Sequence, residues 1–391
     1  MAWDDREAAR SAVTTAGVEF ADLNTIGLAG FDAIIVSPGV PLNTHPLARR
    51  AAKAGVPVLG DIELFALARP ELPAHKVIGI TGTNGKSTTT ALIHHLLLTA
   101  GIPARLGGNI GLPILGQSPL GAGGVYVLEL SSFQIDLTNS LDCDVTVCLN
   151  ITPDHLDRYD GFDAYAAAKA RLFDMQSKDG VAIISLDSAA SRALAARQPR
   201  SFGISAADIN DQSAWPTLQG PHNAENVAAA CAAALHVGAS PAAIAQGLAS
   251  YPGLPHRMER IATKRGILYV NDSKATNPTS TAPALAAYPR IHWICGGLNK
   301  TDELDACLPH LGHVKAAYTI GKAEELFANI LRPHVRVEQI QTVVKATQLA
   351  ASRALPGDVI LLSPACASYD QFKDFEARGD AFREAVGGLP E

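Results

Sequence analysis

Residues 79–87 read Gly-Ile-Thr-Gly-Thr-Asn-Gly-Lys-Ser, and this stretch decides the fold class. It lies between an apolar run and a leucine-rich run typical of a helix, residues 87–100. Glycines let backbone N–H groups approach phosphate oxygens, the helix N-terminus favours negative charge, and Lys86 adds a cation. Ile80 stands where the usual G-x-x-x-x-G-K-[ST] pattern has its first glycine, so we expect Gly82 to make the tight turn. The stretch predicts a phosphate-binding loop rather than a glycine turn with a surface lysine.

Short apolar runs alternate with alanine- and leucine-rich stretches along the whole chain, which is the pattern of parallel α/β layers. The expected strands are residues 33–36, 56–59, 77–81, 125–130, 145–150, 267–271, 292–295, 317–320 and 358–362. The expected helices are residues 46–54, 87–100 and 223–236. Stretches rich in proline and glycine at 68–74 and 253–255 indicate boundaries. We therefore expect three α/β domains, at residues 1–72, 73–254 and 255–391.

Composition limits the classes of partner. Apolar residues make up 47% and charged residues 18% of the 391 residues, which is enough to bury large cores. The formal net charge of −6 gives no electrostatic reason to expect nucleic acid or an anionic membrane as partner. Apolar runs such as residues 227–235 are too short to span a membrane, and residues 1–7 do not resemble a signal peptide. Six cysteines without a C-x-x-C pair predict reduced, mostly buried thiols in a cytoplasmic protein.

Polar side chains follow the expected strands of the first half. Glu129 lies at the end of one strand, and residues 150–158 follow the next. Because carboxyl ends of parallel strands meet at the edge where α/β sheets bind ligands, Glu129 can hold a magnesium ion there, or it can be an ordinary solvated residue at a strand end. His155 can bind a second metal ion or serve as a capping or core residue. From the residue pattern alone, Lys169 is an exposed helix lysine.

The second half carries further polar clusters. Asn223 and Asn226 are three residues apart, so both can face one ligand, or one can cap the helix. Arg257 follows the second boundary and can bind a nucleotide or form an ion pair between domains. Residues 271–277 and 363–372 each close an expected strand with acids, bases and hydroxyls. These clusters indicate a second ligand-binding edge.

Together these segments resemble the Mur ligase family. The matching blocks are residues 60–63 (Gly-Asp-Ile-Glu), 81–87 (Thr-Gly-Thr-Asn-Gly-Lys-Ser), 107–111 (Gly-Gly-Asn-Ile-Gly), 129–134 (Glu-Leu-Ser-Ser-Phe-Gln), 154–159 (Asp-His-Leu-Asp-Arg-Tyr), 222–226 (His-Asn-Ala-Glu-Asn), 253–257 (Gly-Leu-Pro-His-Arg), 271–277 (Asn-Asp-Ser-Lys-Ala-Thr-Asn) and 363–368 (Ser-Pro-Ala-Cys-Ala-Ser). The blocks at 129–134, 271–277 and 363–368 are typical of the members that add D-glutamate. The resemblance implies a Rossmann-like N-terminal domain, a central P-loop ATPase-like domain and a Rossmann-like C-terminal domain.

The same resemblance implies an ATP-dependent carboxylate–amine ligase of the cytoplasmic stage of peptidoglycan synthesis. Its substrates would be UDP-N-acetylmuramoyl-L-alanine and D-glutamate. ATP would phosphorylate the carboxylate of the first, and the amine of the second would attack the acyl phosphate. The implied cofactors are ATP, two Mg²⁺ ions and a CO₂-derived carbamate on Lys169, and we expect a monomer.

Site residues follow from the matching positions. The residues implied to act in catalysis are Lys86, Lys169, His155, Lys274 and Asn109. The ATP-binding residues are Gly82, Thr83, Asn84, Gly85, Lys86, Ser87, Thr88, Asn223, Asn226, Arg257 and Asp272. The magnesium ligands are Ser87, Glu129, His155 and carbamylated Lys169. The substrate-binding residues are Asp4, Asp5, Arg6, Ser37, Gly39, Ser131, Thr276, Lys300, Ser368, Tyr369 and Phe375.

Two departures from the family pattern qualify the resemblance. The family's first domain opens with a strand and a glycine loop that help to hold uridine diphosphate, whereas residues 1–6 align with the end of the second strand. The N-terminal domain is therefore expected to be shortened. Tyr369 stands where family members often carry leucine. Two alternatives stay open: another ligase, either a different Mur enzyme or a folylpolyglutamate synthase, and a nucleotide-binding protein without ligase activity.

Overall fold

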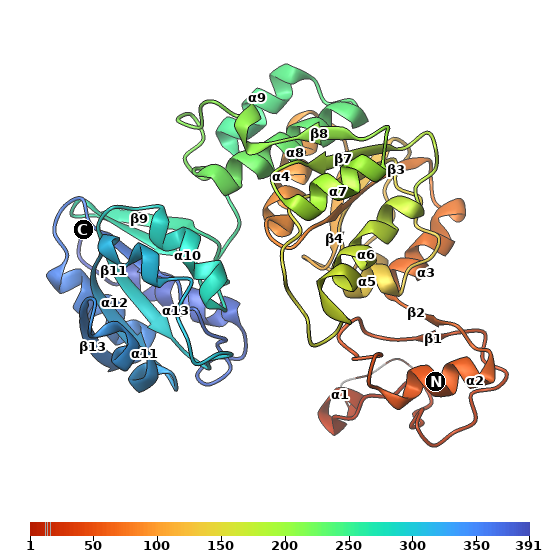
Figure 1. The fold of residues 1–391 in the computed structure, drawn as a ribbon, viewed down its shortest axis with the longest axis horizontal. Coiled ribbons are helices and arrows are strands. Elements are labelled where there is room, and N and C mark those ends of the chain that lie inside the picture. The colour runs from red at the N-terminus through yellow and green to blue at the C-terminus, as the bar shows by residue number, and fades with distance from the viewer. Residues whose placement is uncertain (12, 14, 16) are drawn as a thin grey trace. The chain divides into compact units, whose positions relative to one another are not determined.

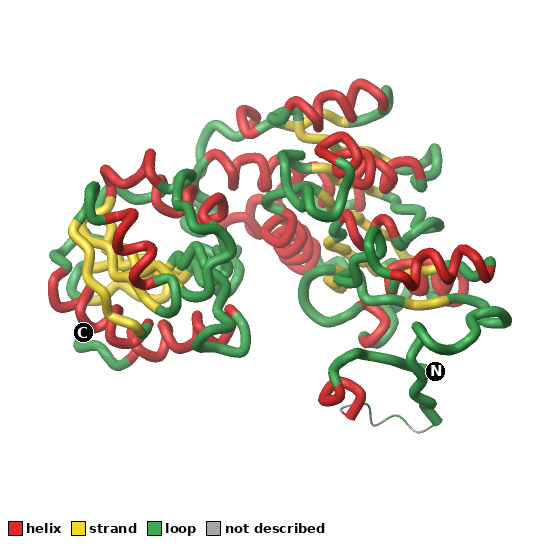
Figure 2. The backbone as a smooth tube through the Cα atoms, turned by 60° about the horizontal axis from the view of Figure 1, so that its bottom comes forward, coloured by secondary structure: helices red, strands yellow, loops and turns green. Residues whose placement is uncertain are grey.

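The computed structural model of the protein describes residues 1–11, 13, 15 and 17–391. They form two compact units, the first containing Met1–Asp211 and Pro221–Ala249 and the second Gln212–Gly220 and Ser250–Glu391. In each unit, strands form layers with helices packed beside them (Figure 2). The expected α/β class is confirmed, whereas the three domain boundaries stay a prediction.

The main sheet of the first unit contains six parallel strands in the spatial order β4-β5-β3-β6-β7-β8. Of these strands, β3, β4, β7 and β8 are labelled in Figure 1. The strands are β3 (His75–Thr81), β4 (Ala104–Gly108), β5 (Gly124–Glu129), β6 (Val145–Cys148), β7 (Val181–Ser185) and β8 (Phe202–Ile204). The predictions of β3, β5 and β6 are confirmed. After β3 the chain forms β4 and β5 on one side of that strand and then β6, β7 and β8 on the other. The carboxyl ends of β5, β3 and β6 therefore lie at the switch point where such sheets bind ligands.

Helices pack on this sheet in two groups. The helices of this part are α3 (Asp61–Ala68), α4 (Lys86–Thr99), α5 (Ser132–Asp136), α6 (Gly161–Asp174), α7 (Ala189–Arg197), α8 (Pro221–Val237) and α9 (Pro241–Ser250). α4 packs against α8, and α5 packs against α6. Side chains of α3, α5 and α6 share a buried cluster with Val77 and Leu128 of the sheet. This packing fixes the starts of α4 and α8 beside the carboxyl end of β3.

The N-terminal segment of the first unit has a small core of its own. Its elements are α1 (Glu7–Ser11), β1 (Ile34–Ile35), α2 (Pro46–Ala54) and β2 (Val58–Leu59), with β1 and β2 parallel. The predicted helix at 46–54 is confirmed; proline opens it and Gly55, at φ 68°, ends it. Leu137, which follows α5, belongs to the same buried cluster as Ile34 and Leu47. The segment is thus packed onto the rest of its unit.

The sheet of the second unit has the order β13-β12-β11-β14-β10-β9. The strands are β9 (Glu259–Lys264), β10 (Ile267–Asn271), β11 (Ile291–Gly296), β12 (Val314–Ile320), β13 (Arg336–Gln341) and β14 (Val359–Leu362), and only the β9–β10 pair among them is antiparallel. The helices are α10 (Pro278–Ala286), α11 (Glu324–Leu331), α12 (Val343–Arg353) and α13 (Phe375–Gly387). Buried clusters around Trp293 and Tyr318 complete two cores.

Short 3₁₀ helices occur at η1 (Arg69–Glu71), η2 (Ile114–Gly116), η3 (Ala206–Asp208) and η4 (Leu308–His313). Five cysteines are buried and Cys231 is half-buried, which confirms the expectation of mostly buried thiols. None of the helices in the described residues combines the length and the apolar character needed to cross a membrane.

Candidate active site

The predicted phosphate-binding loop connects β3 to α4. Gly82 and Gly85 have φ of 146° and 85°, a backbone conformation that other residues rarely adopt. A Cβ atom on Gly85 would lie 2.2 Å from Asn226 Oδ1 of α8. Glycine therefore permits the close approach of α8 to the loop. The N–H groups in the first turn of α4 have no intrahelical acceptors, and such a helix N-terminus can bind an anion.

Two lysine amines meet at one carbonyl oxygen of this loop. Lys86 Nζ donates to Gly82 O at 2.9 Å and to Thr83 O at 2.8 Å, and Lys169 Nζ donates to Gly82 O at 2.9 Å. Lys169 is only 1% exposed, so it is not a surface helix lysine, and its amine lies 4.6 Å from the ring centre of Tyr165. Burial, followed by the charge of Lys86, lowers the pKa of Lys169 to about 7. Much of this amine is therefore unprotonated near neutral pH.

The carboxylate of Glu129 lies at the end of β5 and is buried. Its Oε1 accepts a hydrogen bond from Asn109 Nδ2 at 2.9 Å, whereas Oε2 has no hydrogen-bond partner in the described part of the chain. A Cβ on Gly108 would lie 2.2 Å from Glu129 O, so glycine allows β4 to bring Asn109 this close. A buried carboxylate oxygen without a partner is costly, and a cation beside it removes that cost.

The donor set at the loop fits a magnesium ion. Mg²⁺ takes one or two carboxylates and completes its octahedron with water and phosphate oxygens. Glu129 supplies an open oxygen, and Ser87 places a buried hydroxyl in the first turn of α4. Among the described side chains there is no cluster of three or more histidines, cysteines, aspartates or glutamates that could hold a metal. A metal here would therefore share its coordination with a bound phosphate.

His155 lies in the loop between β6 and α6. It has a left-handed φ of 52°, its side chain is 47% exposed, and its Nε2 lies 3.6 Å from Asp154 Oδ2. Its ring centre is 4.8 Å from that of Phe133 and 6.3 Å from that of Tyr165. The residue before α6 is Asp160, so His155 is neither a core residue nor the cap of that helix. Its imidazole and the Lys169 amine both lie beside Tyr165.

The asparagines of α8 contact α4 and each other. Asn226 Oδ1 accepts from Thr89 Oγ1 at 3.1 Å, and its Nδ2 donates to Asn223 Oδ1 at 3.1 Å. Both residues are buried, as is the predicted ATP-binding residue Thr88. These amides are therefore placed directly behind the phosphate-binding loop.

A neighbouring network was missed by sequence reasoning. Glu225 is buried, and its Oε2 accepts from Asn150 Nδ2 at 2.8 Å. Asn150 Oδ1 in turn accepts from the backbone N–H of Asn84, at 3.0 Å. Burial raises the pKa of Glu225. A glutamate early in a helix is typical of a solvated position, so nothing in the sequence signalled this buried support of the loop.

The predicted substrate residues of the first unit lie in the N-terminal segment and at the start of α5, and they make local contacts. Arg6 Nε lies 3.2 Å from Asp4 Oδ1, and Trp3 Nε1 donates to Asp5 Oδ1 at 3.0 Å. Ser37 and Gly39 form a turn after β1 and are exposed. Ser131 is the N-cap of α5, with its hydroxyl accepting from Gln134 N at 3.2 Å.

The two predicted nucleotide residues of the second unit lie just before β9 (Arg257) and just after β10 (Asp272). Asp272 is buried and accepts from Met258 N at 3.1 Å and from Ser363 Oγ at 2.7 Å. Burial raises the pKa of Asp272 to about 6. Arg257 Nε is buried and, among the described residues, has no hydrogen-bond partner. Both groups thus retain capacity for a ligand.

The predicted D-glutamate residues of this unit lie after β10, β11 and β14. Lys274 Nζ lies 4.5 Å from the ring centre of Phe375, and Lys300 Nζ donates to Thr276 Oγ1 at 3.2 Å. Since these strands are parallel neighbours, their carboxyl ends share one edge. Ser368 is buried at this edge, whereas Tyr369 is 71% exposed.

Arg378 supports this edge and was also missed. It is only 1% exposed, and it donates to Ser273 O at 2.8 Å, to Ser273 Oγ at 3.0 Å and to Ala367 O at 3.2 Å. Burial lowers its pKa to about 10. It lies within an amphipathic helix, where an arginine is usually a surface residue, so no pattern pointed to it.

Comparisons with known proteins show the family to which the chain belongs. Residues 80–216 match the Mur ligase middle domain, and residues 256–366 match the Mur ligase, glutamate ligase domain. A protein of Novosphingobium aromaticivorans named UDP-N-acetylmuramoylalanine–D-glutamate ligase is 58% identical over 395 residues, which cover 100% of this chain and 89% of that protein. The chain belongs to the Mur ligase family. A relative of the same name from Sphingopyxis alaskensis is 57% identical over 396 residues, covering 99% of this chain and 91% of that protein.

A solved Mur ligase structure shares the fold. The MurF ligase of Thermotoga maritima in complex with ADP matches with a TM-score of 0.65 at 18% identity, covering 94% of this chain and 97% of that chain. The expected likeness to the Mur ligase family is thus confirmed in sequence and in fold. Within that family's domains, Lys86 and Glu129 lie in the middle domain, and Asp272 and Lys274 lie in the glutamate ligase domain.

Proposed function

We propose that the protein is an ATP-dependent ligase that joins D-glutamate to UDP-N-acetylmuramoyl-L-alanine in peptidoglycan synthesis. The observation that carries the proposal is the convergence at one sheet edge of an anion-binding loop, two amines and an open carboxylate oxygen. The relatives named as D-glutamate ligases support the choice of substrates over those of other Mur enzymes or folylpolyglutamate synthases. We further propose that the protein is a cytoplasmic monomer.

The chemistry follows from the poor reactivity of a carboxylate. Its negative charge repels a nucleophile, and it offers no adequate leaving group. An oxygen of the alanyl carboxylate attacks the γ-phosphorus of ATP, and ADP leaves. In the resulting acyl phosphate the carboxylate charge no longer repels a nucleophile from the carbonyl carbon. The amine of D-glutamate attacks that carbon and releases a proton. The C–O bond then breaks, and phosphate leaves with one carboxylate oxygen.

The loop of the first unit provides the charge stabilisation for this transfer. The backbone N–H groups before α4 and the ammonium of Lys86 hold the phosphates. Ser87 and Glu129 would hold the first magnesium ion, and His155 with Lys169 the second. Bound there, magnesium shields phosphate charge from the approaching carboxylate.

Lys169 is proposed to serve as a carbamate. Its neutral amine attacks CO₂, an N–C bond forms and a proton is lost, so the side chain carries one negative charge shared by two oxygens in place of an ammonium cation. Its burial, its amine 2.9 Å from Gly82 O and its pKa of about 7 support this proposal. An anionic oxygen at this position suits a hard divalent cation.

The remaining assigned residues bind the organic substrates. Asp4, Asp5 and Arg6 are proposed to bind the uridine, and Ser37 and Gly39 to lie near the diphosphate. In the second unit, Lys274 and Lys300 are proposed to meet the two carboxylates of D-glutamate, with Thr276, Ser368 and Phe375 beside them. The Lys274–Phe375 and Lys300–Thr276 contacts support this grouping.

Competition between amino acids tests the proposal. ADP release is measured with ATP, UDP-N-acetylmuramoyl-L-alanine and one amino acid at a time. D-glutamate should support turnover, because Lys274 and Lys300 are proposed to bind its two carboxylates. The fixed positions of the two lysines are proposed to select the D enantiomer. Preferential use of L-alanine, L-glutamate or meso-diaminopimelate would refute the substrate assignment, and no turnover with any of them would favour a nucleotide-binding protein without ligase activity.

A further inference from the structure

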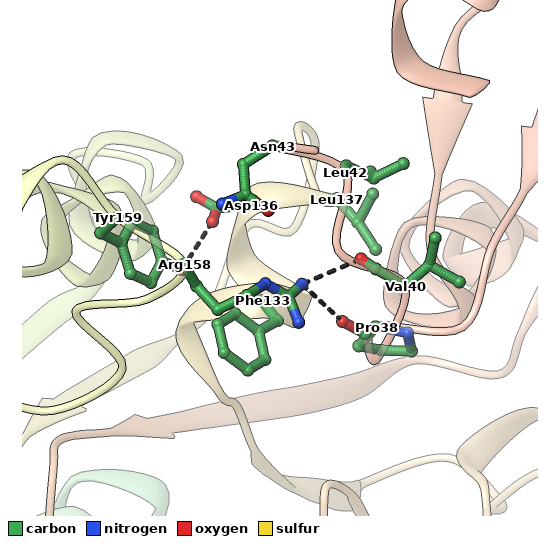
Figure 3. A pocket seen from close by; sticks show the side chains of 9 residues that line it. All are labelled: Pro38, Val40, Leu42, Asn43, Phe133, Asp136, Leu137, Arg158 and Tyr159. Atoms are coloured by element: carbon green, nitrogen blue, oxygen red, sulfur yellow. Dashed lines mark hydrogen bonds between the residues drawn. The ribbon is translucent and has the colours of Figure 1, made fainter. Parts of the chain in front are cut away.

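One guanidinium group joins the N-terminal segment to the loop that carries His155. Arg158 donates from Nη2 to Val40 O at 2.9 Å and more weakly to Pro38 O at 3.5 Å (Figure 3), and from Nη1 to Gly39 O at 3.2 Å. Its Cζ lies 4.2 Å from the ring centre of Phe133, which follows the start of α5. The Arg158 side chain is therefore held between the turn at residues 38–40 of the N-terminal segment and helix α5.

The three acceptors are consecutive carbonyls of one tight turn. Val40 N donates to Ser37 O at 3.0 Å, which closes the turn after β1. Carbonyl dipoles that converge repel one another, and a cation at their focus offsets that repulsion. The C=O and N–H groups of a trans peptide point in opposite directions. Holding the Pro38 carbonyl on Arg158 therefore turns the N–H of Gly39 to the opposite side of the turn.

The other end of the connection is the His155 loop itself. Arg158 N donates to His155 O at 2.9 Å, so the guanidinium and the imidazole extend from one hydrogen-bonded turn. Asn43 Nδ2 donates to Asp157 O at 3.3 Å and adds a second tie between the same two segments. Movement of either segment would therefore strain the other.

Packing at this join is incomplete. A cavity of about 110 Å³ lies beside Arg158, and its lining includes Leu42, Leu137 and Tyr159 (Figure 3). A void deprives the atoms around it of packing contacts. Val40 and Leu42 pack against the buried cluster that contains Leu137, and the hydrogen bonds of the arginine add polar contacts that orient the turn beside this cavity.

We propose that Arg158 is a positioning residue for the UDP-linked substrate. It holds the turn at residues 37–40 in the orientation that receives the diphosphate, at a fixed distance from the His155 loop. This inference rests on the proposed function, in which Ser37 and Gly39 lie near the diphosphate. Arg158 directs its Nη1 and Nη2 hydrogen bonds to the carbonyls of the turn. In this proposal it therefore acts through the turn and not by contact with the substrate.

The test is the affinity of the full-length protein for UDP-N-acetylmuramoyl-L-alanine, measured by calorimetry and as KM. Arg158→Gln removes the charge and the forked donors, and the loss of charged hydrogen bonds should weaken substrate binding about tenfold. The affinity for ATP and kcat should change less than about threefold, because the loss of uniform binding of one substrate raises the KM for that substrate and leaves kcat unchanged. Arg158→Lys keeps the charge without the fork and should show a smaller loss of the same kind.

Arg171→Gln is the matched control. Arg171 donates to Asp136 O at 3.3 Å, to Thr138 O at 3.1 Å and to Asn139 Oδ1 at 3.2 Å, all outside the N-terminal segment. Its replacement removes the same kind of hydrogen bonds without releasing the turn, so substrate affinity should stay unchanged. Asn43→Ala removes the weaker second tie and should lower that affinity less than Arg158→Gln does.

The outcomes separate this inference from the proposed function. A folded Arg158→Gln protein with wild-type substrate affinity would overturn the role of Arg158, and so would an equal loss of ATP affinity. If that variant does not fold, a folded Arg158→Lys variant with unchanged KM overturns it equally. Wild-type protein that binds the UDP-linked substrate but adds no D-glutamate would refute the proposed function alone. Wild-type protein that does not bind the substrate would overturn both.

Discussion

Burial changes the chemistry of single residues in ways that residue type does not reveal. Lys169 would be a surface cation by its position on a helix, yet it is 1% exposed and its pKa is lowered to about 7, first by burial. The strand-end position together with the family resemblance made Glu129 a candidate magnesium ligand, which stays a prediction; its Oε2 has no hydrogen-bond partner in the part of the chain that the structure describes. Glu225 and Arg378 could not be predicted, because their roles depend on contacts with segments distant in sequence.

The carbamate on Lys169 is tested at this scale. In protein equilibrated with ¹³C-labelled CO₂, we expect a carbamate resonance that disappears in Lys169→Ala, because the unprotonated amine is the group that reacts. Ligase activity of that variant should fall at least about a hundredfold through loss of the metal ligand, and added bicarbonate should not restore it. Lys178→Ala, at an exposed lysine of the same unit, should keep both the resonance and the activity. Near-normal turnover of Lys169→Ala would refute the carbamate role.

Among the elements, central strands were predictable and edge strands were not. β3, β5 and β6 are buried on both faces and read as continuous apolar runs. The missed strands β4, β8, β9 and β13 lie at the edges of their sheets, where one side faces solvent and polar residues or glycines interrupt the pattern. β7 was missed although its Val-Ala-Ile-Ile-Ser run is apolar, so its sequence did contain the signal.

A substitution at Gly85 tests how the loop between β3 and α4 packs against α8. Gly85→Ala adds a Cβ 2.2 Å from Asn226 Oδ1 at a φ of 85° and should cost about 2–4 kcal/mol of stability and weaken ATP binding. Gly101→Ala is the matched control, since Gly101 has φ 74° and open space around it. There the backbone strain alone should cost about 1 kcal/mol.

The free energy of unfolding in urea is measured for both variants and for Gly85→Ala combined with Asn226→Ala. These values separate the backbone strain at a positive φ from the steric clash between the new Cβ and the Asn226 side chain. Removing the Asn226 side chain should restore part of the stability lost in Gly85→Ala, because the two residues are in direct contact. Equal costs for Gly85→Ala and Gly101→Ala would contradict a role of α8 in packing against the loop.

The whole molecule divides the predicted chemistry between two compact units. The phosphate-binding loop, Glu129 and Lys169 belong to the first unit, and Asp272, Lys274 and Ser368 belong to the second. From the sequence we expect three domains, with the blocks around Lys86 and around Lys274 in separate ones, at residues 73–254 and 255–391. The discontinuous course of the chain, with Gln212–Gly220 in the second unit, had no signal in the sequence.

The central claim is that a carboxylate oxygen of the UDP-linked substrate becomes part of a phosphate before the amide forms. Substrate labelled with ¹⁸O in the alanyl carboxylate is turned over with ATP and D-glutamate, and the inorganic phosphate is analysed by mass spectrometry. We predict one ¹⁸O atom in each phosphate released, because the C–O bond of the acyl phosphate breaks when the amine displaces it. Unlabelled phosphate accompanying labelled amide product would contradict this account.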